Sequence, residues 1–239
     1  MKKLISTVIL STVFCIPLFA TWSIIVINSR TGEIGIAGAS CTSDCSGIGS
    51  IIPGKGAIIV QAMSNYNAHD VGKRLLREGY SLDEIMNKVL RQSRFDPEHQ
   101  QYAIVTLKEM NPLTYTGDST IFYKGAITGN GISVQGNLLA NDNELKAIFN
   151  AVVQAQDDSL SIDEILFVAL EAGSKAGGDK RCGDQKAKSA FMIVAKPKDD
   201  EKNPYLNLVV TGQQAGESNA VAILRKEYKR WKREEPWIK

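Results

Sequence analysis

The sequence predicts an α/β protein of the α+β kind, built from stacked layers of sheet and helix. Strand-like and helix-like segments are grouped along the chain, in the order strands, helices, strands, helices, strands, helix. Such grouping favours sheets with helices packed outside them over alternating βαβ units, and a two-sheet core with outer helices is one natural solution. No internal repeat or low-complexity linker divides the 239 residues. We therefore expect one domain over 21–239, preceded by a separate leader.

The first twenty residues, MKKLISTVILSTVFCIPLFA, have the layout of a secretory signal peptide. Basic Lys2 and Lys3 precede an apolar run, Pro17 interrupts that run, and a small residue, Ala20, follows. We expect signal peptidase to cleave after Ala20, so that the protein is exported to the periplasm or the cell exterior without stable insertion in the membrane.

Two alternatives to a cleaved leader are open. The apolar run is only slightly shorter than the roughly 20 residues that span a bilayer, so an uncleaved anchor is one of them. A strand-like segment that starts at Trp22 with no linker argues against an anchor. A lipoprotein is the weaker alternative, because Val13 and Phe14 leave no small residue before Cys15.

Charge and cysteine content narrow the class of protein. Without Lys2 and Lys3, 26 basic and 26 acidic residues remain, and this balance indicates no nucleic-acid partner. Cys41, Cys45 and Cys182 would enter an oxidising compartment, where one disulfide and one free thiol is the simplest count. The spacing of Cys41 and Cys45 fits no standard zinc motif, and the chain has two histidines. We expect no metal and no cofactor.

The strands of the first half are rich in β-branched, aromatic and small residues. WSIIVIN (22–28) and IGIAGAS (34–40) flank a turn at 29–33 and predict a hairpin. A Gly-rich connection follows, and then 56–64 predicts a third strand. Beyond a helix, an antiparallel set is expected over 102–107, 113–116, 121–127 and 132–135.

Helical periodicity separates these groups of strands. Apolar residues at i, i+3, i+4, i+7 and i+8 predict a helix over 82–90, where Ser81 and Glu84 form a capping box. The same spacing predicts two further helices over 145–153 and 162–170.

The last third of the chain continues this pattern. Ser161 and Glu164 form a second capping box at the start of the helix over 162–170. Strands are expected at 188–195 and 206–210, and a final helix over 218–231 leads into a basic, solvated tail.

Thr21 is the first candidate for chemistry. Cleavage after Ala20 would make it the amino-terminal residue and the start of a core strand. A threonine hydroxyl needs a base to become nucleophilic, and an amino-terminal threonine carries its own base, an α-amine with a pKa of about 8. The alternative is that threonine is merely the residue that signal peptidase leaves first.

Ser40 and Asn137 are candidates because of their places at strand ends. Ser40 ends the second hairpin strand, and antiparallel pairing places it level with the start of the first strand. It can relay a proton or simply close the strand. Asn137, in VQGNLL, can donate its amide to an oxyanion. An asparagine after glycine is equally a turn residue, unless the fold brings it beside Thr21.

The segment AGGDKRCGDQKAKSAF (176–191) offers a binding function. Gly177 and Gly178 relax the backbone, and Asp179 and Arg181 can form a charge-assisted pair. Such a loop can hold Arg181 fixed for a substrate carboxylate. The other interpretation is a structural clamp, which is the commoner role of an ion pair in a Gly turn.

TWSIIVI, IGIAGAS, QAMSN, VQGNLLA and above all GGDKRCGDQKAKSA resemble the bacterial family catalogued as domain of unknown function 1028. The resemblance covers Thr21 to about Val210, and relatives also expose a threonine at the position of Thr21 once an initial methionine is removed. The family is classed with the Ntn-hydrolase-like superfamily (Ntn, amino-terminal nucleophile). This classification implies a four-layer αββα sandwich with the amino-terminal residue in a cleft between the sheets.

Two departures from the family pattern involve cysteine. Cys182 stands where relatives often have glycine, and Cys41 and Cys45 lie in a segment usually free of cysteine. Cys41 ends an early strand and Cys182 precedes a late one near the same rim of the cleft that the resemblance implies, so we expect Cys182 to form a disulfide with Cys41 or Cys45.

Two functional interpretations follow. In the first, the protein is an amidohydrolase that acts on a small amide or peptide, with Thr21 as nucleophile and Asn137 or backbone amides at the oxyanion. In the second, it is a non-catalytic, envelope-associated or ligand-binding protein that retains the Ntn fold, because no lysine near the hairpin is evident to tune the α-amine. The sequence also allows a homo-oligomer.

Overall fold

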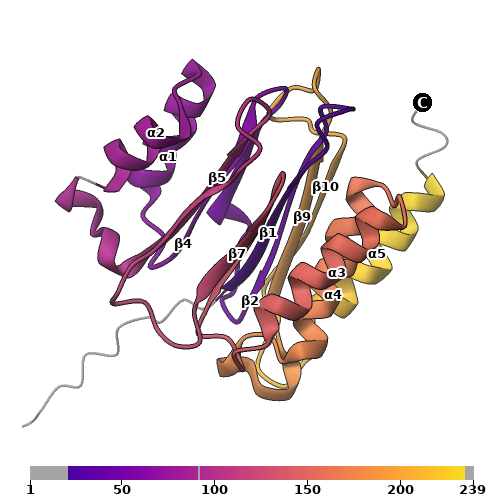
Figure 1. Ribbon diagram of the computed structural model, residues 1–239. Coiled ribbons are helices and arrows are strands. Elements are labelled where there is room, and N and C mark those ends of the chain that lie inside the picture. Colours follow the sequence, from indigo (N-terminus) through magenta and orange to yellow (C-terminus); the bar gives the residue numbers. More distant parts are fainter. Residues whose placement is uncertain (1–20, 91, 235–239) are drawn as a thin grey trace, which may run out of the picture.

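The computed structural model describes residues 21–90 and 92–234 and shows a mixed α/β fold with two antiparallel sheets and several helices (Figure 1). The predicted signal peptide over 1–20 and the end of the basic tail, 235–239, lie outside the described residues. None of the helices in the described part of the chain is both long and apolar enough to cross a bilayer.

The larger sheet has six strands in the order β10-β9-β2-β1-β8-β7. Its strands are β1 (Thr21–Ile27), β2 (Ile34–Ser40), β7 (Gly125–Gly129), β8 (Ile132–Asn137), β9 (Ser189–Ala195) and β10 (Leu206–Val210). The predicted hairpin is confirmed, because β1 pairs antiparallel with β2. On its other side β1 pairs antiparallel with β8, so the first strand of the hairpin lies inside the sheet.

The smaller sheet has four strands in the order β3-β4-β5-β6. They are β3 (Gly49–Ile52), β4 (Gly56–Ala62), β5 (Gln100–Thr106) and β6 (Leu113–Thr116). The antiparallel set expected over 102–135 is therefore wrong as one unit, because its first two strands belong to this sheet and its last two to the larger one. The chain crosses between the sheets after β6.

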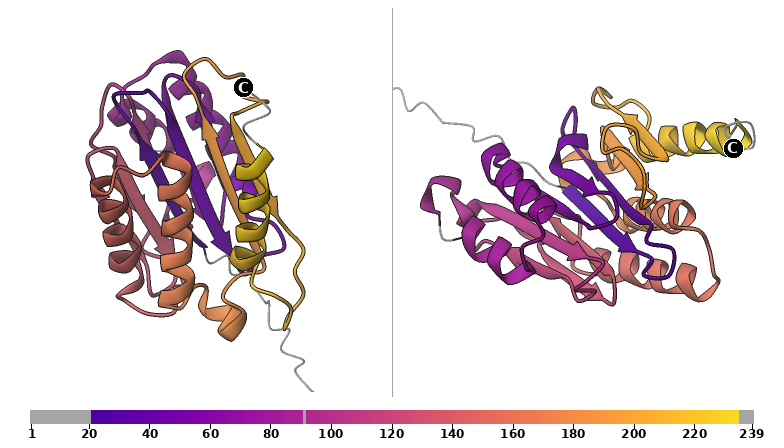
Figure 2. Two further views of the ribbon diagram at one scale, coloured as in Figure 1. Left: turned by 90° about the vertical axis from the view of Figure 1, so that its right-hand side faces the viewer. Right: turned by 90° about the horizontal axis from the view of Figure 1, so that it is seen from above.

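Helices cover the outer face of each sheet. The helices α1 (Tyr66–Glu78) and α2 (Leu82–Leu90) pack on the four-stranded sheet, whereas α3 (Glu144–Asp157), α4 (Ile162–Ala176) and α5 (Ala220–Glu234) lie side by side on the six-stranded sheet (Figure 2). Both predicted capping boxes are present: the Ser81 and Ser161 N–H groups donate to Glu84 and Glu164 at 3.0 Å.

Three features differ from the sequence prediction. The helix α1 is absent from the sequence prediction, because small and polar residues make up much of its buried face; Asn65 caps it by accepting from the Ala68 N–H at 3.1 Å. The Gly-rich connection contains β3 and a short 3-10 helix, η1 (Ser46–Ile48). The strand expected over 121–127 begins only at Gly125, since Ile121 to Tyr123 form an exposed turn and not a buried face.

Apolar side chains fill the space between the sheets and the space under each helix layer. Between the sheets, β1 and β2 contact β4 and β5 through a buried cluster that includes Ile25, Ile36, Ile59, Ala103 and Val105. Burial of this kind is the main favourable contribution to folding.

Polar side chains also cross the core between the sheets. Gln61 of β4 accepts from the Ser23 hydroxyl of β1 at 2.6 Å and donates to Gln101 of β5 at 2.6 Å. Gln135 of β8 donates to Ser23 Oγ at 2.6 Å, and all four residues are fully buried. We call Ser23, Gln61, Gln101 and Gln135 the inter-sheet polar network. Because each amide has a partner, the network fixes how one sheet sits on the other.

We expect Gln61→Leu to lower the free energy of unfolding by about 1 to 3 kcal/mol, because the Ser23 hydroxyl loses its acceptor and Gln101 loses a donor in a dry core. Gln154→Leu, on the exposed side of α3, is the matched control and should change it by less than about 0.5 kcal/mol. Urea unfolding followed by circular dichroism measures both. Equal stability of the two variants would contradict a structural role for the network.

Candidate functional site

Thr21 lies at the end of the central strand, between two candidate residues. In the antiparallel register Thr21 is the partner of Ser40 in β2 and of Asn137 in β8. The prediction that Ser40 lies opposite the start of the first strand is confirmed. The fold also brings Asn137 beside Thr21. All three residues are almost fully buried. Three polar side chains that are far apart in the sequence thus meet at one edge of the six-stranded sheet.

Hydrogen bonds hold the polar groups around Thr21 in place. Ser40 Oγ accepts from both the N–H and the hydroxyl of Thr42, at 3.2 and 3.1 Å. Asn137 Nδ2 donates to Gln101 Oε1 at 3.4 Å, and Gln61 Nε2 reaches the Thr21 carbonyl at 3.4 Å. The inter-sheet polar network therefore extends to the residues on which the site depends.

A pocket of about 350 Å³ opens at Thr21. It is lined by Thr21, Thr42, Asp44, Cys45, Ser46, Gly47, Ile48, Ala62, Ser64 and Tyr66. Its wall thus combines the start of β1, the segment after β2 and the end of β4. Of the three residues Thr21, Ser40 and Asn137, only Thr21 lines the pocket.

Cys45 also lines this pocket, and burial keeps its thiol unreactive. Its side chain is buried, and burial raises the pKa of the Cys45 thiol to about 12. The thiolate is the reactive form, so a thiol with this pKa is protonated at neutral pH. Cys45 therefore does not compete with Thr21 as a nucleophile in this pocket.

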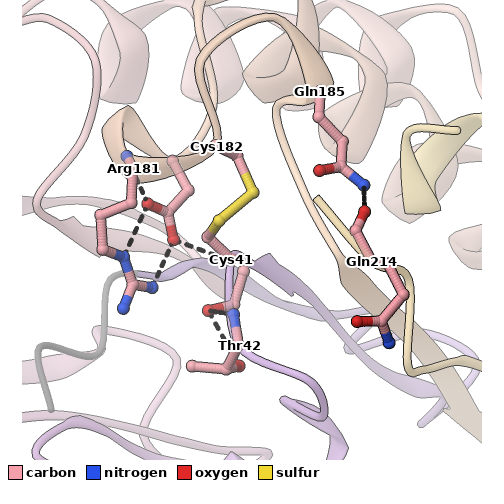
Figure 3. Close-up of a disulfide and its surroundings, with 8 residues drawn as sticks. Cys41, Thr42, Arg181, Cys182, Gln185 and Gln214 are labelled. Carbon is pink, nitrogen blue, oxygen red and sulfur yellow. Dashed lines mark hydrogen bonds and ion pairs between the residues drawn. A yellow bond between two sulfur atoms is a disulfide. The ribbon is translucent and has the colours of Figure 1, made fainter. Parts of the chain in front are cut away.

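The predicted ion pair between Asp179 and Arg181 is present. Asp179 Oδ2 lies 2.6 Å from Arg181 Nη2, and Oδ1 accepts from Arg181 Nε at 3.0 Å (Figure 3). The Asp179 carboxylate is fully buried, whereas the Arg181 side chain is 26% exposed. A two-point contact of this geometry fixes the plane of the guanidinium.

The segment that carries this pair lies across the strands on both sides of Thr21. Asp179 Oδ2 accepts from the Cys41 N–H at 2.7 Å, directly after β2. Asp179 also forms an antiparallel bridge with Leu139, and the Lys180 N–H donates to Leu138 at 3.2 Å, directly after β8. The structure therefore places the predicted catalytic and substrate-binding residues at the same end of the sheet.

A disulfide ties this segment to β2. Cys41 and Cys182, whose sequence separation is 141, are joined (Figure 3), and Cys45 is free. Of the two partners expected for Cys182, the structure has Cys41. The short helix η4 (Lys180–Gln185) that carries Arg181 and Cys182 is thus held by a covalent bond as well as by the Asp179 contacts.

Sequence reasoning missed the polar residues behind Thr21. Gln61 and Gln101 lie in strands that are otherwise largely apolar, and a glutamine in such a strand is the signal that could have indicated a buried partner. It also missed Asp44, the charged residue of the pocket wall. Within residues 21–90 and 92–234, no group of three or more His, Cys, Asp or Glu side chains is placed to hold a metal ion.

Comparison with known proteins identifies the family. The family model described as a family of unknown function, DUF1028, matches residues 21–217. The chain belongs to the DUF1028 family. The match begins at Thr21, and it includes every residue of the site described above.

A solved structure shares the fold of this DUF1028 chain. The crystal structure of protein SPO2555 from Silicibacter pomeroyi, itself assigned to DUF1028, superposes with a TM-score of 0.72 at 24% identity and covers 89% of each chain. No curated protein matches the chain. The comparisons thus establish family and fold.

We expect loss of the disulfide to destabilise the protein strongly. In the chain-entropy model, a cross-link that closes about 140 residues contributes about 4 to 5 kcal/mol. Cys182→Ser should therefore lower the melting temperature, and a reducing agent should have no further effect on this variant.

Peptide mapping without reduction checks the connectivity directly. One cross-linked pair of Cys41 and Cys182 is expected, with Cys45 alkylated only after unfolding because it is buried. Three alkylatable thiols in protein from an oxidising compartment would contradict the pairing.

Proposed function

We propose that the mature protein is an exported N-terminal-nucleophile amidohydrolase that cleaves a small amide or peptide bond, with Thr21 as nucleophile. The observation that carries the proposal is the position of Thr21. It starts the central strand, lines a pocket of about 350 Å³ and has Ser40 and Asn137 as register partners. The family match that begins at Thr21 adds support.

The arrangement of layers agrees with this assignment. Two antiparallel sheets face each other through an apolar cluster, and helices cover the outer face of each. We assign this arrangement to the αββα sandwich of the Ntn-hydrolase type, in which the amino-terminal residue lies between the sheets. In this assignment the contact of Gln61 in β4 with the Thr21 carbonyl marks the floor of the cleft.

The proposed reaction begins when the Thr21 hydroxyl oxygen adds to the substrate carbonyl carbon. Its proton passes to the Thr21 α-amine, which acts as general base. The carbonyl oxygen becomes negative and accepts hydrogen bonds from Asn137 Nδ2 or from backbone N–H groups. One hydrogen of Asn137 Nδ2 is already donated to Gln101 Oε1. When the tetrahedral intermediate collapses, the C–N bond breaks and the leaving amine takes the proton from the α-ammonium.

Water then completes the cycle. It attacks the Thr21 ester and gives a proton to the α-amine, and the Thr21 oxygen leaves with that proton. We assign the relay of protons during these steps to Ser40, an assignment supported by its position as the register partner of Thr21. No metal or cofactor takes part in the proposed reaction.

Arg181 is assigned to a carboxylate of the substrate. Asp179 and the disulfide hold the guanidinium in one orientation beyond the strand ends, and 26% of the Arg181 side chain is exposed. A rigid arginine is well suited to two-point recognition of a carboxylate. The structural-clamp interpretation predicts instead that Arg181 never contacts a ligand.

Export is part of the proposal, because a free Thr21 amine requires removal of the leader. The disulfide between Cys41 and Cys182 supports an oxidising compartment, where such bonds form and persist. A small amide or peptide is the partner that the function requires.

The alternative is a non-catalytic binding protein with the same fold. One observation favours it: none of the residues that line the described Thr21 pocket is a lysine that could tune the α-amine. An α-amine with its ordinary pKa of about 8 is still partly unprotonated at neutral pH, so catalysis does not require such a lysine.

Covalent labelling distinguishes the two functions. A β-lactone should acylate the mature wild-type protein at Thr21, and Thr21→Ala or one residue added before Thr21 should abolish labelling, because each change removes the hydroxyl or displaces the amine. Ser46→Ala is the matched control, because Ser46 is a hydroxyl residue that lines the same pocket and its loss should leave labelling intact. Equal labelling of wild type and Thr21→Ala refutes the enzymatic proposal.

A second variant tests the oxyanion role. Asn137→Ala should lower kcat for a cleaved amide by about 10²- to 10³-fold, equivalent to about 3 kcal/mol, if the Asn137 amide donates to the oxyanion. Asn141→Ala, which loses a surface-side contact with the Ala176 carbonyl, serves as the control. Unchanged kcat in a folded Asn137→Ala protein would reduce Asn137 to a structural residue.

A further inference from the structure

A buried carboxyl group with no partner lies beneath the segment that carries Arg181. Glu144 is the first residue of α3; its side chain has no exposed surface, and neither carboxyl oxygen has a hydrogen-bond partner among the described residues. Buried acidic groups are normally paired or hydrogen-bonded, so this one requires an explanation.

A comparable acid on the neighbouring helix shows the usual arrangement. Asp163 lies in the first turn of α4 and is also buried, but its Oδ2 accepts from the Tyr228 hydroxyl at 2.6 Å and lies 3.1 Å from Lys232 Nζ. These contacts lower the pKa of Asp163 despite its burial. Glu144 lacks any such contact.

The turn formed by Gly177 and Gly178 lies against the Glu144 carboxyl group. A methyl group at Gly177 would come within 3.6 Å of Glu144 Oε2 and 2.4 Å of the Ala140 side chain, so the turn is closely packed here. The nearby N–H groups of Ala140 and Gly178 already donate to the carbonyls of Gly178 and Gly173, both at 3.0 Å. These N–H groups are therefore engaged elsewhere, and as weak partners of the Glu144 carboxyl group they lower its pKa only in part.

The charges near Glu144 belong to the same loop. Burial is the largest influence and raises the pKa of Glu144 to about 8, and the negative charge of Asp179 acts in the same direction. The N–H groups of Ala140 and Gly178 and the charge of Lys186 act in the opposite direction. Glu144 is thus protonated and neutral in the folded protein at neutral pH. Ionisation would place a second negative charge close to Asp179, whose carboxylate holds Arg181.

We propose that Glu144 is a positioning residue for Arg181, which keeps the segment from Gly177 to Arg181 in place while protonated and displaces it when ionised. The physical link is short, because Gly178 immediately precedes Asp179 and is hydrogen-bonded to Ala140. A carboxylate in this dry space requires water or a stronger donor, and movement of the turn would supply one. The consequence for substrate binding rests on the proposed function, whereas the coupling of Glu144 to Arg181 does not.

Nuclear magnetic resonance tests the coupling without any substrate. In the mature wild-type protein, the Gly178 amide and the Arg181 Nε–H signals should shift with pH with a midpoint of about 8. Glu144→Gln, which resembles the protonated state in shape, should remove this component and retain the low-pH signals at pH 9.5.

Asp163→Asn is the matched control, because it removes a buried carboxyl from the equivalent turn of α4. Its Gly178 and Arg181 signals should titrate as in the wild type. The proposal is overturned if these signals do not shift near pH 8 in the wild type, or if they shift equally in Glu144→Gln.

Melting temperatures give an independent measure of how ionisation of Glu144 changes the stability of the folded protein, and the direction of the change is defined. An acid whose pKa is raised in the folded state destabilises the protein progressively as pH rises from its unfolded value, about 4.3, to its folded value, about 8. Glu144→Gln should therefore melt higher than the wild type, with a difference that grows over this interval and is constant above it. A difference that does not depend on pH would count against the proposal.

Enzyme kinetics separate this inference from the proposed function. For an amide that carries a carboxylate, wild-type KM should rise about fivefold or more above pH 8, and the rise should be absent in Glu144→Gln. If Thr21 fails to label but the Arg181 signals still lose their titration in Glu144→Gln, the positioning role stands and the hydrolase proposal falls. If Thr21 labels and KM has the same pH profile in both proteins, the positioning role falls.

Discussion

The register of β1 is the constraint on which the site depends. Because β1 is central in the six-stranded sheet, its first residue, Thr21, has the end of a neighbouring strand on each side. Antiparallel pairing makes Ser40 and Asn137 the residues opposite Thr21. A slip of one residue would turn Thr21 to the opposite face and would separate it from the pocket. The apolar residues of β1 enforce the register, since they alternate between the inter-sheet core and the core under the helices.

Polar contacts then refine what the apolar core holds together. The inter-sheet polar network connects the sheets through Gln61 and Gln101, which also contact Thr21 and Asn137. At the sheet edge, Asp179 is bonded to the segments that follow β2 and β8. These buried and part-buried contacts surround Thr21, and such support is what the proposed nucleophile requires to keep its geometry.

Much of the fold could be predicted because its signals are local. The hairpin of β1 and β2 and the two capping boxes follow from short-range patterns, and antiparallel pairing alone was sufficient to place Ser40 level with Thr21. The position of Asn137 could not be derived in this way. It depends on β8 pairing with β1, and neither strand indicates its neighbour when the two are more than 100 residues apart.

The remaining errors also have physical causes. The helix α1 is amphipathic, but small and polar residues make up much of its buried face, so it carries little apolar signal. The run from Ile121 to Tyr123 is apolar but exposed, and composition alone cannot distinguish it from a strand. Glu144 looks like an ordinary acidic residue at a helix start, and only the packing of the turn at Gly177 reveals its burial.

The central claim, that Thr21 becomes the amino-terminal residue, is tested most directly by sequencing the amino terminus of the exported protein. We expect Edman degradation to yield Thr-Trp-Ser-Ile and the intact mass to correspond to residues 21–239 with one disulfide. A retained leader, or a first residue other than Thr21, would contradict the account, because the hydroxyl would then have no adjacent amine to act as its base.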